Sequence, residues 1–479
     1  MSEPTRAVTP LTLFEAVLPL LVMLVLFVAG MAILEMGTEL LIAVMLGASA
    51  VAGAIAARHG HGWDAIQRAT AEKLAGVLPM ILILLCIGML IATWVFSGTI
   101  PYLVYWGVKL VNPRYLLVTA FLATSVMSVT TGTSWGSAGT IGVALMGTAA
   151  ALNAPLAATA GAVVSGAYFG DKMSPLSDTT NICAIGAGAQ LYDHVRHMLY
   201  TAVPSFIAAL IVYTVAARLS PIATDGMPAS AQGLLGNLED HFRLHWIVLI
   251  PPVLVVASIV RRVPPALAMA GASAIAALIG MGFQGFSLQS AIISAVAGFR
   301  ADMIPTVGGD VAALSSGFTT LVERGGLYSM ANTLIVVIAA FLLAGALDAS
   351  GALDLIIGRL LRTVRGVFGL ISATMASGAV TIALTSHAGV TALVVGELYQ
   401  KAYAERGLAP ENLSRSLEDS VTVVEPIMPW TVTAVFMATT LGVPTISYLP
   451  WAVFCYGGTI GSLAIAALYS RTGYGIKRV

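Results

Sequence analysis

The sequence is poor in charged residues. Only 10% of its 479 residues are Asp, Glu, Lys or Arg, whereas 58% are apolar. A soluble globular protein carries about 25% charged residues, because its surface must be solvated. A chain of this length with 23 basic and 23 acidic residues cannot cover a water-facing surface. The composition therefore predicts a protein embedded in a membrane, with lipids as neighbours.

Other features are scarce too, and each excludes a class of protein. The formal net charge is zero, so there is no excess of basic charge with which to bind nucleic acid. The cysteines Cys86, Cys183 and Cys455 lie far apart and lack the spacing of a metal site. Seven scattered histidines offer no nucleophile–base pair of the kind an enzyme needs. We therefore expect neither an enzyme nor a cofactor.

The apolar runs match the ~20 residues that a helix needs to cross a bilayer and exceed the ~10 of a barrel strand. We therefore expect an all-α polytopic membrane protein with about 11–13 transmembrane segments. Basic residues gather in Arg58–Lys73, at Arg261-Arg262 and at the C-terminus. The positive-inside rule places these parts, and with them the N-terminus, in the cytoplasm, and so predicts a multi-pass protein of the cytoplasmic (inner) membrane.

Short patterns recur in the same order in the two halves of the chain, which indicates an internal duplication. They are Ser97-Gly98 with Ser350-Gly351, Thr133-Ser134 with Thr385-Ser386, and Asp171 and Asp178 with Glu418 and Glu425. The distribution of basic residues favours opposite orientations for the two copies. Inverted repeats are typical of secondary transporters, whose substrate site lies between the repeats near the membrane midplane.

The repeats suggest four parts. Residues 1–74 form a two-helix hairpin and a cytoplasmic amphipathic linker, and residues 75–217 form the first transport repeat. Residues 218–325 hold an extracytoplasmic loop, Arg218–Arg243, and connecting helices. Residues 326–479 form the second, inverted repeat.

The stretch Ser125–Thr140 is dense in hydroxyl residues and glycine and separates two apolar segments. This pattern favours a broken helix or re-entrant hairpin, which is tolerated in a membrane where it is buried in protein or lines a cavity. The alternative is close helix packing through small residues.

The stretch Gly170–Asn181 places Asp171, Lys172 and Asp178 around Pro175 between apolar arms. Acids inside a membrane are costly and mark functional sites. We expect Asp178 to be the main coupling acid, with Asp171 second, because Asp178 lies within the apolar continuation. The alternative is an interfacial loop with a surface pair of Asp171 and Lys172.

The second half repeats this arrangement with different residues. Glu425 precedes two prolines within an apolar run, which predicts another broken span. Glu418 and Asp419 either belong to the site or cap a helix beginning near Ser420. His387, in the place of Trp135 of the first repeat, is either a core residue or a proton carrier.

Sodium is a hard cation that prefers oxygen ligands. We expect Na⁺ at Thr133, Asp178, Thr179 and Asn181, and a charge-modulating role for Lys172 beside Asp171. The further candidates for substrate or cation binding are Ser134, Ser177, Thr180, Thr385, Ser386, Asp419 and Thr431.

Three segments strongly resemble the NhaC family of sodium/proton antiporters: GTSWGSAGTIGVALMGTAAAL, SGAYFGDKMSPLSDTTN and LSRSLEDSVTVVEPIMPWTV. The resemblance implies a secondary antiporter of the ion transporter superfamily, with inverted repeats, re-entrant hairpins and a homodimeric assembly. Ser386-His387-Ala388-Gly389 and Glu425 depart from the family pattern, in which an acidic stretch and a small hydroxyl residue are usual.

Two functions follow as expectations. In the first, Na⁺ or Li⁺ exchanges for H⁺ by competition at buried carboxylates, because burial disfavours the charged form of an unaccompanied acid. In the alternative, Na⁺ or H⁺ drives exchange of small organic anions or amino acids, such as malate for lactate. Helix N-termini would then bind the substrate carboxylate, and His387 and Lys172 favour this version.

Overall fold

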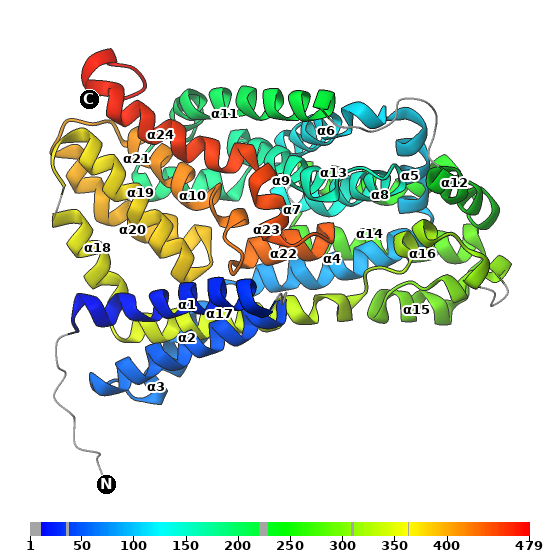
Figure 1. Ribbon diagram of the computed structural model, residues 1–479, viewed down its shortest axis with the longest axis horizontal. Helices are drawn as coiled ribbons and strands as arrows, with labels where there is room; N and C mark the ends of the chain where they lie inside the picture. The colour runs from blue at the N-terminus through cyan, green and yellow to red at the C-terminus, as the bar shows by residue number, and fades with distance from the viewer. Residues whose placement is uncertain (1–10, 35–37, 220–228, 262, 308–310, 363) are drawn as a thin grey trace, which may run out of the picture.

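The computed structural model describes residues 11–34, 38–219, 229–261, 263–307, 311–362 and 364–479 (Figure 1). Apart from turns and short 3₁₀ and π segments, this part of the chain is α-helical, with one isolated β-bridge between Leu408 and Arg478. The α-helices of the first part are α1 Leu13–Leu34, α2 Thr38–Arg58, α3 Trp63–Gly76, α4 Leu78–Phe96, α5 Thr99–Leu110, α6 Leu116–Thr131, α7 Ser134–Ser137, α8 Val143–Ala151, α9 Leu156–Met173, α10 Asp178–Ala187, α11 Leu191–Leu219 and α12 Ala229–His241. The others are α13 Ile250–Val260, α14 Pro265–Ile279, α15 Leu288–Ala297, α16 Ser316–Val322, α17 Ala331–Ala349, α18 Ala352–Arg362, α19 Gly366–Thr385, α20 Ala388–Ala404, α21 Pro410–Leu417, α22 Val432–Leu441, α23 Thr445–Tyr448 and α24 Val453–Thr472.

Eight helices in the described ranges are long and apolar enough to cross a membrane, and ten spans result if each of two bent helix pairs counts as one. This number is below the 11–13 segments expected, because several apolar stretches form short helices. For example, α8 has nine residues and α20 has 17, fewer than the ~20 that a bilayer requires. The all-helical, multi-span membrane architecture is nevertheless confirmed.

The expected hydrophilic loop Arg218–Arg243 contains a helix in its described part. Helix α12 buries Leu234 and Leu238 in the main hydrophobic core, so its apolar residues are the reason that it folds onto the protein. The chain then bends by 102° between residues 231–241 and the next helical segment. Arg262, one of the basic residues used to orient the chain, lies outside the described residues.

Helices α6 and α9 lie against each other through glycine. A Cβ atom added at Gly166 would stand 2.3 Å from the carbonyl oxygen of Phe121, and one at Gly170 would stand 2.4 Å from the backbone nitrogen of Val129. Both distances are far below normal contact, so only glycine allows this approach. Small residues at such positions let membrane helices pack backbone to backbone.

Helices α10 and α20 meet in a similar way. A Cβ atom added at Gly396 would stand 2.4 Å from the carbonyl oxygen of Gly186. In addition, the side-chain amide of Gln400 donates a 2.7 Å hydrogen bond to that oxygen. This contact joins a helix of the first half to one of the second half, and Figure 1 shows both beside α19 and α21.

The recurring sequence patterns adopt recurring local structures. Ser97 and Ser350 each donate a hydrogen bond to the carbonyl oxygen three residues earlier, at 3.2 and 2.9 Å. The glycine that follows each serine has positive φ, 83° at Gly98 and 71° at Gly351. The order of helix, turn and helix is thus the same in both halves, whereas the opposite orientation of the copies stays a prediction.

Candidate functional site

Helix α6 is broken where the hydroxyl-rich stretch begins. Gly132 has a φ of 70° and ends α6, and the Thr133 hydroxyl accepts a 3.3 Å hydrogen bond from the backbone N–H of Gly136 to cap α7. The expected break within Ser125–Thr140 is therefore present. A Cβ atom added at Gly132 would stand 2.9 Å from the carbonyl carbon of Leu176, so this break touches the one between α9 and α10.

Helix α9 continues through Asp171 and Lys172 and ends at Met173. The chain turns over Ser174–Ser177, and α10 begins at Asp178 with Ser177 as its cap. Both Asp171 and Lys172 are buried, with 6% and 1% of their surfaces exposed. The alternative of a solvated loop with a surface pair is wrong, because the helix holds both side chains inside the protein.

Asp171 faces the start of α7. The Ser134 hydroxyl donates a 2.7 Å hydrogen bond to its Oδ2 atom, and the backbone N–H of Ser134 and the Ser177 hydroxyl also face the carboxylate. Asp171 forms no ion pair with any residue in the described ranges. A carboxylate in this setting is partly stabilised by donors at a helix N-terminus, but no positive side chain neutralises it.

Asp178 occupies a different environment. It is exposed at the first position of α10, on the same face as Ile185, which is 68% exposed. The sequence predicts Asp178 as the main coupling acid because it lies within an apolar stretch, but the structure does not bury its side chain. The burial required of an intramembrane coupling acid is found at Asp171 instead.

Glu425 is the second buried acid near this point. It lies in the broken segment before α22, only 4% exposed, and it interacts electrostatically with Asp171. Its carboxylate also faces the backbone N–H of Ala388, at the start of α20, and the Thr433 hydroxyl. Its Oε1 atom has no hydrogen-bond partner among the described residues. Asp171 and Glu425 thus each face the first residue of a helix that follows a break, α7 for Asp171 and α20 for Glu425.

The break between α19 and α20 resembles that between α6 and α7. Ser386, with a φ of 52°, takes the place of Gly132. His387 takes the place of Thr133, because its Nδ1 atom accepts a 3.3 Å hydrogen bond from the backbone N–H of Val390 and caps α20. The expected register, which paired His387 with Trp135, is therefore wrong by two residues.

Lys172 and Asp419 form an ion pair that is fully buried. The Lys172 ammonium also donates to the Thr201 hydroxyl at 3.3 Å, and Ser462 donates to Asp419 Oδ2 at 2.7 Å. The alternative that Glu418 and Asp419 cap a helix beginning near Ser420 is wrong. Helical structure begins at Pro410 and runs through both acids.

Glu418 is a buried acid that the proposed site had not included. It is 0% exposed, the Thr422 hydroxyl donates to its Oε2 atom, and its Oε1 atom has no partner among the described residues. It interacts electrostatically with both Lys172 and Asp171. The expected pairing of Asp171 with Glu418 in the repeat is wrong, because the register that aligns Gly132 with Ser386 also aligns α9 with residues 410–427, and Asp171 with Glu425.

Most of the predicted hydroxyl and amide ligands make local bonds at the breaks. Thr180 donates to the carbonyl oxygens of Asp171 and Lys172, both at 3.2 Å, and Asn181 donates to those of Pro175 and Ser177. The others pair as Ser177 with Thr179, Thr385 with Thr391, and Thr431 with the carbonyl of Glu425. Ser386 is an exception, because its buried Oγ atom has no partner in the described chain. A Na⁺ site at Thr133, Asp178, Thr179 and Asn181 stays a prediction.

A second polar cluster, which sequence analysis did not identify, lies where the C-terminal residues meet α21. Arg415 is 0% exposed and donates a 2.6 Å hydrogen bond to the carbonyl oxygen of Gly475. Lys477 pairs with Glu411 at 2.6 Å, and His194 shares a 2.7 Å hydrogen bond with Ser414. Only tertiary structure brings α11, α21 and the last residues together.

Comparison with known proteins identifies a family and several relatives of this chain. Residues 166–469 match the model of the Na⁺/H⁺ antiporter family. The chain is 43% identical over the full length of both proteins to a Na⁺/H⁺ antiporter of Haemophilus influenzae described as uncharacterized. It is 35% identical to the Na⁺/H⁺ antiporter NhaC of Alkalihalophilus pseudofirmus, over 82% of this chain and 83% of that protein.

A third relative is the malate-2H⁺/Na⁺-lactate antiporter of Bacillus subtilis, 30% identical over 96% of this chain and 95% of that protein. These matches confirm the resemblance to NhaC-type antiporters and the expectation of a transporter rather than an enzyme. The chain belongs to the Na⁺/H⁺ antiporter family.

Proposed function

We propose that the protein exchanges Na⁺ for H⁺ across the membrane, with Asp171 and Glu425 as the acids at which the two ions compete. One observation carries this assignment. Two buried carboxylates from different halves of the chain lie close enough to interact, and each faces the start of a helix after a break. Binding sites between the repeats are typical of secondary transporters with broken helices.

The electrostatics of the pair supports competition between a proton and a cation. Two carboxylates that share a buried site repel each other when both are charged. A proton on one acid, or a Na⁺ ion between them, removes that repulsion. Lys172 is paired with Asp419, so no basic side chain in the described ranges neutralises the charge of Asp171. The free Oε1 atom of Glu425 and the free hydroxyl of Ser386 leave oxygen available to a hard cation.

Exchange of organic anions is less well supported by the geometry. The two residues that favoured it are both occupied, Lys172 by Asp419 and Nδ1 of His387 by the backbone of Val390. A substrate carboxylate therefore finds no free charged donor at this point. Because one relative is a malate-2H⁺/Na⁺-lactate antiporter, malate and lactate are the organic anions to test beside Na⁺ in a transport assay.

The test is transport in proteoliposomes, with lumenal pH followed while Na⁺, Li⁺, K⁺, malate, lactate and arginine are supplied in turn. We expect Na⁺ or Li⁺ to drive proton movement in the wild type. Asp171→Asn should reduce it to the level of empty liposomes, because the amide cannot titrate. Glu425→Gln should weaken the apparent affinity for Na⁺. Asp178→Asn should reduce exchange less than Asp171→Asn, because Asp178 is exposed, and the exposed control Asp240→Asn should leave exchange near the wild-type rate. Proton movement that depends on malate or lactate and not on Na⁺ alone would refute Na⁺/H⁺ exchange.

We also propose that the protein resides in the cytoplasmic membrane with both ends inside. The support is the basic bias of Arg58–Lys73 and of the C-terminal residues. Cysteines introduced at positions 261 and 471 should resist a membrane-impermeant thiol reagent in intact cells, and one at position 240 should react. The homodimer implied by the family resemblance stays a prediction, which light scattering of the purified protein would test.

A further inference from the structure

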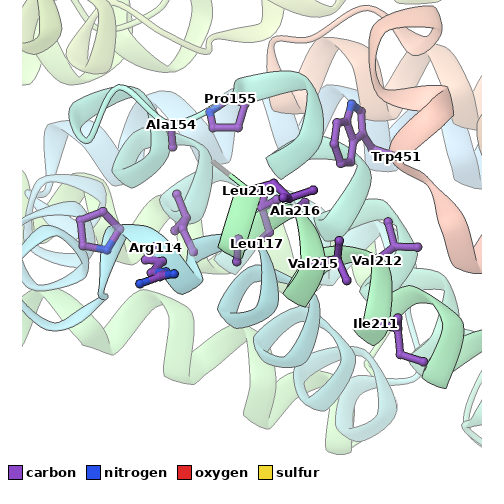
Figure 2. Close-up of a pocket in the computed structure, with 13 residues that line it drawn as sticks. Arg114, Leu117, Ala154, Pro155, Ile211, Val212, Val215, Ala216, Leu219 and Trp451 are labelled. Atoms are coloured by element: carbon purple, nitrogen blue, oxygen red, sulfur yellow. The ribbon is translucent and has the colours of Figure 1, made fainter. Parts of the chain in front are cut away.

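An apolar pocket of about 510 Å³ opens at the surface of the protein, and none of the buried acids lines it. Figure 2 shows Arg114 on one side of it and Trp451 on the other, with Leu117, Val215 and Leu219 between them. Its walls come from the start of α6, the turn before α9 and the last turns of α11. Aliphatic side chains make up nearly all of the lining, so the pocket suits a hydrocarbon chain.

Arg114 is the single charged residue that lines this pocket. Its side chain is half-buried, and its guanidinium forms no hydrogen bond or ion pair with any residue that the structure describes. An unpaired guanidinium at the mouth of an apolar pocket attracts an anion, and its planar fork suits the oxygens of a phosphate.

The pocket also lies at the ends of two candidate membrane spans, where lipid tails meet head groups. It joins the first residues of the candidate span 113–131 to the last residues of the candidate span 191–219. Both ends therefore reach the same side of the membrane. Trp451, an amphipathic aromatic residue, is typical of this interfacial level.

We propose that this pocket binds a phospholipid with an anionic head group, whose acyl chain fills the apolar wall while its phosphate pairs with Arg114. The proposal is independent of the transported ion. Its occupant would hold together α6, α9, α11 and the segment before α24. Tyr213, on the same turns of α11, already ties these parts, because its hydroxyl donates to the carbonyl oxygen of Trp451 at 2.5 Å and accepts from the Ser165 hydroxyl at 2.8 Å.

The experiment compares lipids with the same acyl chains and different head groups. Purified full-length protein in detergent is titrated with phosphatidylglycerol or phosphatidylcholine, and bound lipid is counted by native mass spectrometry. The midpoint of thermal unfolding is followed in parallel. We expect the wild type to prefer phosphatidylglycerol. Arg114→Ala should weaken that binding about fivefold, the effect of one basic residue near an anionic lipid surface. Arg114→Lys should keep part of the preference.

Two further variants separate this site from general contact with lipid. Val215→Trp should fill the pocket and abolish retention of both lipids, with elution volume and circular dichroism used to check that the protein is folded. Arg218→Ala is the matched control, because Arg218 is an exposed arginine near the same end of α11 that does not line the pocket. It should bind phosphatidylglycerol as the wild type does.

Three results would overturn the proposal. The first is an unchanged preference for phosphatidylglycerol in Arg114→Ala. The second is an equal loss in Arg218→Ala, which would indicate nonspecific surface charge. The third is normal lipid binding by folded Val215→Trp together with a change of oligomeric state, which would make this face a contact between two copies of the chain.

Discussion

Lys172 of the first half of the chain and Asp419 of the second half form a buried ion pair with each other. Lys172 follows Asp171, and Asp419 follows Glu418, so each partner of the pair is adjacent to a buried acid. The pair therefore links the end of α9 to the π-helical segment Glu418–Thr422 in the interior. This pair gives a direct test of how the halves are held together.

Removing either charge alone should destabilise the protein strongly. Lys172→Met leaves the Asp419 carboxylate buried without its cation, and Asp419→Asn leaves the ammonium without its anion. Breaking one side of a buried pair costs about 3–5 kcal/mol, whereas removing both charges is often nearly neutral. We expect the double variant to recover most of the unfolding midpoint lost by each single variant. Equal and additive losses would contradict the coupling.

Gly458 should tolerate no side chain. A Cβ atom there would stand 2.5 Å from Asp419 Oδ1 and 3.6 Å from Lys172 Nζ. Gly458→Ala should therefore displace the ion pair and cost about 1–3 kcal/mol, as overpacking does. The control is Gly461→Ala on the same helix, where the added Cβ atom would stand 3.6 Å from the side chain of Thr201, an ordinary contact. That variant should be neutral or slightly stabilising, because alanine favours helix. The measurement is the midpoint of thermal unfolding for both variants.

His387 is expected to act as a helix cap rather than as a proton carrier. A doubly protonated imidazole has no free nitrogen with which to accept the bond from Val390. His387→Ala should cost about 1 kcal/mol, the usual value of an N-cap, whereas His387→Ser and His387→Asn should restore most of it. All three variants should keep Na⁺-driven proton movement. Loss of exchange in a stable His387→Ser protein would contradict this and show that His387 takes part in transport.

The contact of the C-terminal residues with α21 should weaken at high pH. The hydrogen bond to Glu411 raises the pKa of Lys477 above its ordinary value of 10.5. A raised folded-state pKa means that the stabilisation is complete below about pH 10 and is lost as the pH rises through the folded value. From pH 8 upward, the wild type should have a higher midpoint of thermal unfolding than Lys477→Gln. The two midpoints should converge as the pH rises through the pKa of Lys477 in the folded protein. A difference that is constant through the alkaline range would show that the ammonium charge is not responsible.

Composition and local pattern were sufficient for much of the fold. Sparse charge and long apolar runs predict a polytopic helical protein, and glycine, proline and hydroxyl density predicted the breaks at Gly132, at Ser174–Ser177 and before α22. Helical spans and their breaks are set by residues close together in the sequence, which is why local pattern predicts them. The recurrence of Ser-Gly was also visible in the sequence, and the structure shows that the glycine has positive φ in both copies.

The candidate site depended on information that the sequence does not carry locally. Asp171 and Asp178 are seven residues apart in the same polar stretch, yet one is buried and the other exposed. Which of them faces inward is decided by the close approach of α6 and α9 and by the turn at Pro175. Likewise Lys172, adjacent to Asp171, pairs with a residue 247 positions away. Partners at such distances along the chain follow from packing alone.

The crossing of α10 and α20 has a mechanical consequence. At Gly186 and Gly396 the helices touch through their backbones, and beside this contact the flexible Gln400 side chain donates a hydrogen bond to the Gly186 carbonyl oxygen. Helices that interlock through large side chains can shift only by repacking them, because protein interiors are as dense as crystals. A smooth contact between two backbones lacks that obstacle. Sliding by an ångström or two, the shear type of movement, therefore meets less steric resistance at this crossing than at an interlocked one.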